Sequence, residues 1–296
     1  MCLHSGNSPG AKVGDSVGYI LNARENYFVT QMSFSYCHVY LTLKDEQTVA
    51  GARWLPPPAQ FTLSNNEVHV WRASLDQNEA TMAGLWELLT TEERRRAQRY
   101  CFQKGRRQFV VARGVLRRII ALYTELHPAT LTLTSNRYGR PSLSSDSNPA
   151  ELEFNLSHSG NLVLYAFSRG RAVGIDIEAV RKEIATLNIA ENFFSPDEVA
   201  ALKAVPADMR TAAFFNCWTR KEAFIKAVGE GLSYPLHNFS VSLAPHEEAA
   251  LLSVRGDQRA AARWKIYALE PGAGYSAAVI AENPPFSLRE WEYVCD

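Results

Sequence analysis

Residues 154–180 read FNLSHSGNLVLYAFSRGRAVGIDIEAV, and no other segment constrains the fold of this chain as strongly. Three apolar stretches are separated by a Ser-Gly-Asn turn and an Arg-Gly-Arg turn, and the first and last stretches alternate between apolar and polar residues. Alternation with a period of two, interrupted by short glycine-containing turns, predicts three successive β-strands. The chain is therefore expected to contain a sheet built around the middle of its sequence.

Helices and further strands are predicted on both sides of this segment. Helices are predicted at 90–100, 105–122, 192–204 and 209–228, and strands at 68–75, 131–136, 239–243, 264–269 and 275–281. The order of a strand, helices and more strands occurs about twice, although no letter-by-letter repeat accompanies it. We expect an α+β fold of two similar halves, residues 67–170 and 171–296, related by a pseudo-twofold axis, with the active site in the cleft between them.

The first part of the chain differs in composition from the rest. Gly, Ser and Asn are frequent in the first twenty residues, and Pro56, Pro57 and Pro58 follow in a row. Proline runs form stiff spacers, and polar termini are commonly poorly ordered. Residues 1–66 are therefore predicted to be a partly disordered or peripheral extension.

Charge and cysteine content restrict the class of protein. The formal net charge is zero, so no global field draws the chain to nucleic acid or to a membrane surface. No window approaches the ~20 apolar residues that a membrane span requires, and the first residues lack the order of a signal peptide. The five cysteines are scattered and form no Cys-x-x-Cys pair, which favours a reducing compartment over a disulfide framework or a zinc site. A cytoplasmic protein is expected.

The sequence Gly-Ile-Asp-Ile-Glu at 174–178 predicts a strand with an acidic face. Asp176 and Glu178 point to one side of such a strand, and Ile175 and Ile177 point to the other. Two neighbouring carboxylates repel each other unless water or a shared cation separates them, and oxygen ligands of this kind suit Mg²⁺. The alternative is a half-buried edge strand with a polar face, which is the commoner origin of such alternation.

The sequence Phe-Asn-Leu-Ser-His-Ser at 154–159 also alternates. Asn155, Ser157 and Ser159 share one face of the predicted strand, and His158 lies on the other. Because neighbouring strand residues point in opposite directions, Ser157 and His158 cannot act as the nucleophile and base of a hydrolase. His158 is either a contact for an anionic ligand or a structural residue.

Two arginine-containing segments are candidate anion sites. The turn Arg-Tyr-Gly-Arg-Pro at 137–141 offers guanidinium groups beside a glycine, although it could also be an ordinary solvated turn. The segment 93–118 contains ten basic residues against one acidic residue, with Tyr100 and Phe102 among them. A nucleic-acid-binding surface is one explanation of this basic segment, and a site for a small polyphosphate is the other.

The segment WTRKEAFIKAVGEGL at 218–232 predicts a helix that ends at Gly229 and Gly231. Glu222 and Lys226 lie one turn apart on the same face of this helix. An exposed pair of this kind contributes only ~0.3–0.5 kcal/mol to stability. Taken alone, the two residues are most simply a surface ion pair, and a role in an acid–base site is the alternative.

Four of these motifs occur in an order that resembles a known family. They are the turn at 137–141, the strands at 154–159 and 174–178, and the helix at 218–232. Together they are similar to the 4′-phosphopantetheinyl transferase superfamily, specifically its larger Sfp-type class, over about residues 68–281. The resemblance implies two similar α+β halves in one chain that works as a monomer. It also implies transfer of the phosphopantetheine arm of coenzyme A to a serine of an apo carrier protein, with release of adenosine 3′,5′-bisphosphate.

The resemblance further implies a metal site and a catalytic pair. Asp176, Glu178 and Glu222 match the ligands of the family's Mg²⁺, and whether Mn²⁺ can replace it is left open. Glu222 is our candidate for the base that takes the proton of the carrier serine, directly or through water. Lys226 is expected to stabilise or protonate the departing bisphosphate.

Eight residues are implied to contact coenzyme A, and they come from all the motifs: Arg96, Gly139, Arg140, Pro141, Ser157, His158, Asp176 and Lys226. Arg140 stands where the family has a lysine, which keeps the positive charge and allows bidentate contact with phosphate. Arg96 stands where the family has a basic residue for the 3′-phosphate, but other arginines of the basic segment could take that position.

The expected partners are apo carrier proteins or carrier domains of fatty acid, polyketide or nonribosomal peptide synthesis, and the sequence does not distinguish between them. No nucleic acid or membrane partner is expected. Two alternatives stay open, namely a basic protein that binds nucleic acid and an inactive homologue that binds only coenzyme A.

Overall fold

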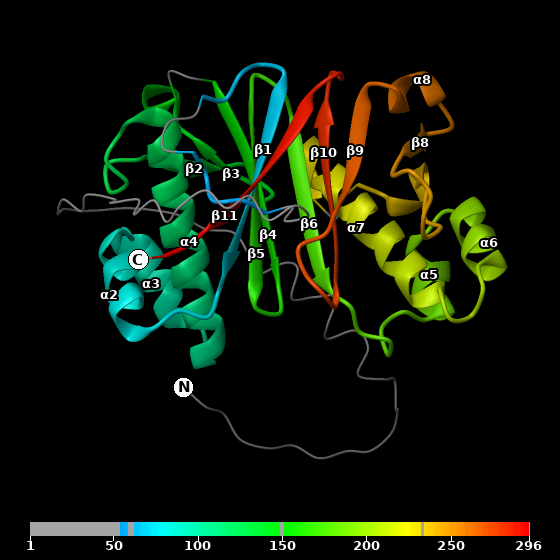
Figure 1. Ribbon diagram of the computed structural model, residues 1–296, viewed down its shortest axis with the longest axis horizontal. Coiled ribbons are helices and arrows are strands. Elements are labelled where there is room, and N and C mark those ends of the chain that lie inside the picture. Colours follow the sequence, from blue (N-terminus) through cyan, green and yellow to red (C-terminus); the bar gives the residue numbers. More distant parts are fainter. Residues whose placement is uncertain (1–53, 59–61, 149–150, 232–233, 296) are drawn as a thin grey trace, which may run out of the picture.

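A four-stranded sheet and a three-stranded sheet form the middle of the molecule (Figure 1). The computed structural model describes residues 54–58, 62–148, 151–231 and 234–295. The larger sheet has the strand order β11-β1-β5-β4, and the smaller has the order β6-β10-β9. Their strands are β1 (Glu67–Ser74), β4 (Leu152–Ser159), β5 (Leu162–Arg169), β6 (Val173–Ala179), β9 (Trp264–Leu269), β10 (Tyr275–Glu282) and β11 (Ser287–Tyr293).

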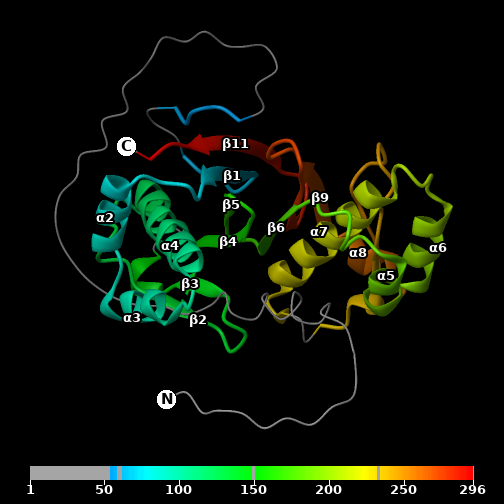
Figure 2. The ribbon, with the colours of Figure 1, turned by 90° about the horizontal axis from the view of Figure 1, so that it is seen from below.

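Helices lie on both sides of the central strands (Figures 1 and 2). One side has α2 (Glu79–Glu87), α3 (Thr91–Arg99) and α4 (Gln103–Thr124), and the other has α5 (Leu187–Phe193), α6 (Pro196–Ala204) and α7 (Arg210–Val228). Smaller elements complete the described chain: the pairs β2 (Leu133–Ser135) with β3 (Pro141–Leu143) and β7 (Phe239–Val241) with β8 (Leu251–Val254), and α8 (Gln258–Ala261). None of the helices in the described residues is long and apolar enough to cross a membrane.

Alternation along the central strands produces three apolar layers. Trp71 and Tyr165 belong to the layer that includes α4, and the Tyr165 hydroxyl donates a hydrogen bond to a carbonyl of that helix. Val70 and Leu164, their neighbours in sequence, belong to a second layer that the two sheets share. Ile280 of β10 packs in the third layer, which includes α7. The period of two therefore gives each sheet one face for helices and one face for the other sheet.

Most predicted elements are present, and one is wrong. The three strands between residues 152 and 179 and the helices α3, α4 and α7 lie within a few residues of their predicted positions. The single helix predicted at 192–204 is two helices, because Ser195 caps the start of α6 and Pro196 stands at its first turn, where a proline cannot continue the preceding helix. The elements α2, β3, β8, α8 and β11 were not predicted.

The last strand returns to the sheet of the first. β11 pairs in parallel with β1, so that Trp291 lies opposite Trp71. Leu63 is buried in the layer with α4, and Leu55 forms an isolated bridge to Trp291. Part of the segment before residue 67 thus contacts the folded chain, while the rest of the predicted extension, residues 1–53 and 59–61, lies outside the described residues. The division at residues 170 and 171 stays a prediction.

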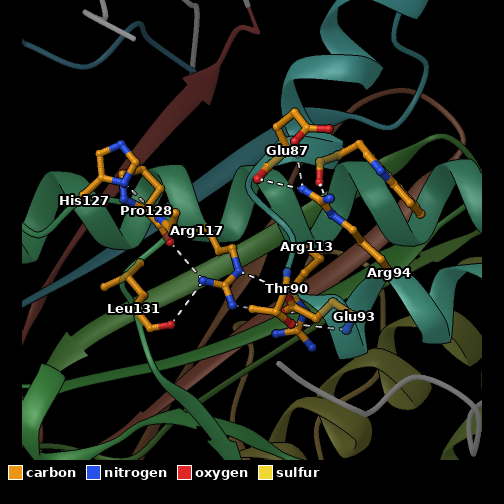
Figure 3. A network of polar contacts seen from close by, with 11 residues as sticks. Glu87, Thr90, Glu93, Arg94, Arg113, Arg117, His127, Pro128 and Leu131 are labelled. Atoms are coloured by element: carbon orange, nitrogen blue, oxygen red, sulfur yellow. Dashed lines mark hydrogen bonds and ion pairs between the residues drawn. The ribbon is translucent and has the colours of Figure 1, made fainter. Parts of the chain in front are cut away.

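A buried charge network fixes α3 to α4 (Figure 3). Thr90 and Glu93 form a reciprocal capping box at the start of α3. The Glu93 carboxylate also accepts from Arg117 Nε at 3.1 Å and lies 3.4 Å from Arg113 Nε. Arg117 donates in addition to the carbonyl of Pro128 at 2.9 Å. Because all these groups are buried, each charge depends on its partners, and the network holds the two helices in one arrangement.

Candidate active site

Gly174 allows α7 to approach β6 closely. A Cβ atom at this position would lie 2.1 Å from the carbonyl oxygen of Ala223 and 2.5 Å from the backbone nitrogen of Ala227. No side chain fits in that space, so glycine is required for close approach of the two backbones. The contact brings Glu222 and Lys226 of α7 towards the acidic face of β6.

Polar side chains join β4 to β6, which are edge strands of the two sheets. Asn155 Oδ1 accepts from the backbone N–H of Ile175 at 3.1 Å. Ser157 Oγ donates to Asp176 Oδ1 at 2.8 Å, and Ser159 Oγ donates to a Glu178 oxygen at 2.9 Å. The predicted faces of both strands are confirmed, and side-chain hydrogen bonds take the place of a backbone ladder between them.

Asp176 has one satisfied oxygen and one unsatisfied oxygen. Lys226 Nζ donates to Asp176 Oδ1 at 2.6 Å and to Ser157 Oγ at 2.9 Å. Asp176 Oδ2 is buried and accepts no hydrogen bond from the described residues. Burial raises the pKa of Asp176, and the charge of Lys226 opposes that rise. β6 is an edge strand, as the alternative interpretation holds, but Asp176 on its acidic face is buried and Glu178 is half-buried.

Glu178 and Glu222 share this environment. Burial and then the charge of Asp176 raise the pKa of Glu178 to about 7. The same two causes, in the same order, raise the pKa of Glu222 to about 8, and Glu178 adds to the rise. Asp176 thus raises the pKa of both glutamates, Glu178 raises that of Glu222, and a cation placed among the three carboxylates would relieve this repulsion.

The donor set fits a divalent cation of the Mg²⁺ type. No group of three or more His, Cys, Asp and Glu side chains within the described ranges is arranged, as it stands, to hold a metal ion. The available donors are nevertheless all carboxylate oxygens, Asp176 and Glu222 are buried and Glu178 is half-buried, and Asp176 Oδ2 has no hydrogen-bond partner among the described residues. Oxygen-only, negatively charged donors of this kind are the ligands that Mg²⁺ prefers.

His158 lies near the same lysine. Burial, and second the charge of Lys226, lower the pKa of His158 to about 4. The imidazole is therefore neutral at pH 7, and it can donate or accept a hydrogen bond without adding charge to the site.

The Arg-Tyr-Gly-Arg-Pro turn joins β2 to β3. Gly139 has φ of 85°, a left-handed conformation that favours glycine, and Pro141 begins β3. Asn136 Oδ1 accepts from the backbone nitrogen of Arg140 at 3.0 Å. Asn136 Nδ2 donates to the carbonyl of Gly229, the C-cap of α7, at 2.9 Å. The turn is thus attached to the end of the helix that carries Glu222.

Arg140 reaches the last turn of that helix. Its Nη1 donates to the carbonyl of Ala227 at 3.0 Å, and its Nη2 donates to a Glu153 oxygen at 3.1 Å. Ala227 directly follows Lys226 in the chain, so Arg140 is bonded to the helix turn that carries this lysine. An arginine at a helix C-terminus is stabilised by the free carbonyls there.

Part of the basic segment is used for contacts within the protein. At least four of its ten basic residues form ion pairs in the helical layer of α2–α4: Arg94 with Glu87, Arg107 with Glu79, and Arg113 and Arg117 with Glu93. Arg96 lies on α3, and its guanidinium is 5.4 Å from the ring centre of Phe109. The structure therefore places Arg96 in this layer and not in the group around Asp176, and its contact with coenzyme A stays a prediction.

Two features of this region have no role in the predictions from the sequence. Ser159 was placed on the correct face, but its bond to Glu178 was not anticipated. Lys221 was not considered, although its Nζ donates to both oxygens of Glu198, at 2.8 and 2.6 Å, and to the carbonyl of Phe239 at 2.7 Å. The Ser-Pro-Asp-Glu sequence at 195–198 is a capping-box pattern that could have indicated a fixed glutamate there.

Comparison with known proteins identifies the family. The model of the 4′-phosphopantetheinyl transferase N-terminal region matches residues 69–169, and that of the 4′-phosphopantetheinyl transferase superfamily matches residues 172–280. The 4′-phosphopantetheinyl transferase HetI of Nostoc sp. is 35% identical over 240 residues, which are 81% of this chain and 98% of the relative. The chain belongs to the 4′-phosphopantetheinyl transferase superfamily. The resemblance inferred from the motifs is confirmed, as is the transferase class.

Other members of the superfamily are similar over shorter ranges. The 4′-phosphopantetheinyl transferase Sfp of Bacillus subtilis (strain 168) is 32% identical over 213 residues, 72% of this chain and 89% of the relative. The enzyme psf-1 of Bacillus pumilus is 35% identical over 193 residues, 65% of this chain and 78% of the relative. In the present chain, Ser157 and His158 lie in the region matched at 69–169. Asp176, Glu222 and Lys226 lie in the region matched at 172–280. The two regions therefore meet at the contact of β4 with β6.

Proposed function

We propose that this chain transfers the 4′-phosphopantetheine arm of coenzyme A to a serine of an apo carrier protein in a Mg²⁺-dependent reaction. Adenosine 3′,5′-bisphosphate is the second product. One observation carries the proposal: two buried carboxylates, the half-buried Glu178 and Lys226 interact where the two matched regions meet, and Asp176 Oδ2 has no hydrogen-bond partner among the described residues. Family membership supplies the type of group transferred.

Asp176, Glu178 and Glu222 would hold the Mg²⁺. When bound, the ion would neutralise negative charge on the diphosphate of coenzyme A. Lys226 brings a positive charge to the same place, where it pairs with Asp176. When coenzyme A binds, the lysine could release Asp176 and contact a phosphate oxygen instead. Arg140 lies close by at the end of α7 and, with the Gly139–Pro141 turn, Ser157 and the neutral His158, is proposed to bind coenzyme A.

Glu222 is proposed as the general base. Without a metal ion, burial and the charge of Asp176 raise the pKa of Glu222 to about 8, so the carboxyl holds a proton readily. A bound divalent cation would favour its deprotonated form, which can accept the serine proton. In the transfer, the serine oxygen forms a bond to the β-phosphorus as the bond from that phosphorus to the bridging oxygen breaks. The serine proton passes to Glu222, directly or through water. The bridging oxygen leaves with the bisphosphate, which Lys226 stabilises or protonates.

The two halves, 67–170 and 171–296, are proposed to be related by a pseudo-twofold axis with the active site in the cleft between them. A repeated arrangement supports this: a capping-box glutamate pairs with a cation of the next long helix, Glu93 with Arg117 and Glu198 with Lys221. The proposal includes a monomer in the cytoplasm, and carriers of fatty acid, polyketide or nonribosomal peptide synthesis as partners. Mn²⁺ is proposed as an alternative metal.

The test is a mass measurement. The protein is incubated with coenzyme A, Mg²⁺ and a panel of apo carrier proteins, and each carrier is examined for a mass increase of one phosphopantetheine arm. We expect an increase that disappears with EDTA and with a carrier whose acceptor serine is replaced by alanine. Coenzyme A binding without a mass increase on any carrier would indicate an inactive homologue and contradict the proposal.

A further inference from the structure

Ser159 makes hydrogen bonds in two directions across the contact of β4 with β6. Its hydroxyl donates to Glu178 Oε2 at 2.9 Å and accepts from the backbone N–H of Ala179 at 3.0 Å. A hydroxyl can donate one hydrogen bond and accept others, so both bonds can exist at once. The same oxygen therefore fixes the carboxylate of Glu178 and the backbone that follows it.

The turn that contains Ser159 is itself held from two other elements. Gln108 Nε2 of α4 donates to the carbonyl of Gly160 at 2.8 Å, and the hydroxyl of Tyr275 on β10 accepts from the backbone nitrogen of Asn161 at 3.1 Å. Gly160 has φ of 57°, and a Cβ there would lie 2.6 Å from the Tyr275 hydroxyl oxygen. The position of Ser159 is consequently set by α4, β10 and β6 together.

Ser157 and Ser159 differ in what their hydroxyls contact. Ser157 is bonded to both Asp176 and Lys226, so a change there disturbs the lysine as well as a carboxylate. Within the described part of the chain, the Ser159 hydroxyl bonds to Glu178 and to the backbone of Ala179, and not to a basic side chain. A change at Ser159 therefore acts on the orientation of one carboxylate and leaves the pairing of Lys226 intact.

We propose that Ser159 is a positioning residue that holds the carboxylate of Glu178 in the orientation needed to bind the divalent cation. The inference rests on the proposed function, because that function makes Glu178 a metal ligand. A carboxylate that is already oriented loses less freedom when it binds a cation. Hydrogen-bond partners of metal ligands typically contribute about 10–100-fold to metal affinity.

The experiment measures metal binding directly. Mn²⁺ is titrated into the wild-type protein and the Ser159→Ala variant with saturating coenzyme A, free Mn²⁺ is followed by electron paramagnetic resonance, and Mg²⁺ is then added as a competitor. We expect the variant to bind both ions about 10–100-fold more weakly. Its affinity for coenzyme A, measured separately without metal, stays unchanged. Ser159→Thr, which keeps the hydroxyl, restores most of the metal affinity.

Ser168→Ala is the matched control. Ser168 is a buried serine at the end of β5 whose hydroxyl donates to the carbonyl of Arg171 at 2.7 Å, so the variant also loses one hydroxyl hydrogen bond near a turn. Its metal affinity should equal that of the wild-type protein. Tyr275→Phe removes the bond to Asn161 but leaves Ser159 in place, and its metal affinity should fall by less than that of Ser159→Ala. This variant also provides a test should Ser159→Ala fail to fold.

Each result has a separate meaning. Unchanged Mn²⁺ affinity in Ser159→Ala, or an equal loss in Ser168→Ala, would overturn the role of Ser159 while leaving transfer activity of the wild-type protein as evidence for the proposed function. A wild-type protein that neither binds Mn²⁺ with coenzyme A nor modifies a carrier would instead overturn the proposed function.

Discussion

Helix α7 carries two lysines five residues apart, and each is bonded to a carboxylate in a different way. Lys221 is 1% exposed and donates to both oxygens of Glu198 and to a carbonyl, while Glu198 also accepts from the backbone nitrogens of Ser195 and Val241. Lys226 is 17% exposed and is bonded to Asp176, whose second oxygen accepts no hydrogen bond from the described residues.

The difference separates a structural ion pair from a site. A buried pair whose donors and acceptors are all matched stabilises one arrangement and offers nothing to a ligand. Around Lys226, by contrast, one oxygen of Asp176 has no hydrogen-bond donor among the described residues, and two further carboxylates interact with Asp176. Their repulsion costs free energy, and a bound cation would lower that cost. Lys221 and Glu222 are neighbours in sequence, yet Lys221 belongs to the structural ion pair and Glu222 belongs to the site.

The largest expected effect is on turnover. Glu222→Gln removes both a proposed base and a proposed metal ligand, so transfer to the carrier should fall by about 10⁴-fold, the upper end of the range for general-base catalysis. Coenzyme A binding should largely survive, and the protein should stay folded because the change removes a repelling charge. Rates from carrier mass, coenzyme A titration calorimetry and circular dichroism test the three parts. Full activity would contradict the assignment of the base.

The second effect is on stability. Lys221→Met leaves the buried Glu198 carboxylate without its cation and should lower the free energy of unfolding by about 3–5 kcal/mol. Urea denaturation followed by circular dichroism measures this loss. Lys226→Met is the matched variant, and it should lose transfer activity at a smaller cost in stability, because its surroundings admit water. Equal destabilisation by the two variants would remove the distinction between the two pairs.

The third effect is a pH dependence of stability in the absence of metal. Glu222 has a folded-state pKa of about 8 against an ordinary value of 4.5. Its contribution to stability is therefore fully present below pH 4.5 and is lost as the pH rises through 8. Between these limits, and with EDTA present, the free energy of unfolding should fall relative to Glu222→Gln by up to about 1.4 kcal/mol per pH unit. Added Mg²⁺ should reduce this fall in the free energy of unfolding. Parallel pH profiles of the wild-type protein and Glu222→Gln would contradict the prediction.

Periodicity predicted much of the fold, and it failed where partners are distant in sequence. The strands around residue 160 and the shared face of Asp176 and Glu178 depend on local alternation, and both are confirmed. The parallel pairing of β11 with β1 joins residues more than two hundred positions apart, for example Glu67 with Ser287, and no local pattern indicates it. The grouping of Glu222 with the two β6 carboxylates came from family resemblance and not from spacing.

The sequence by itself determined which residues share a face. The period of the strands set Asp176 beside Glu178, and the helical repeat set Glu222 one turn from Lys226. Only the tertiary structure decided what those faces meet. Gly174 lets α7 lie against β6, and Lys226, which on its own helix suggested a surface ion pair with Glu222, bonds to Asp176 and Ser157. Spacing fixes neighbours within an element, whereas burial and partners across elements depend on how closely two backbones can approach.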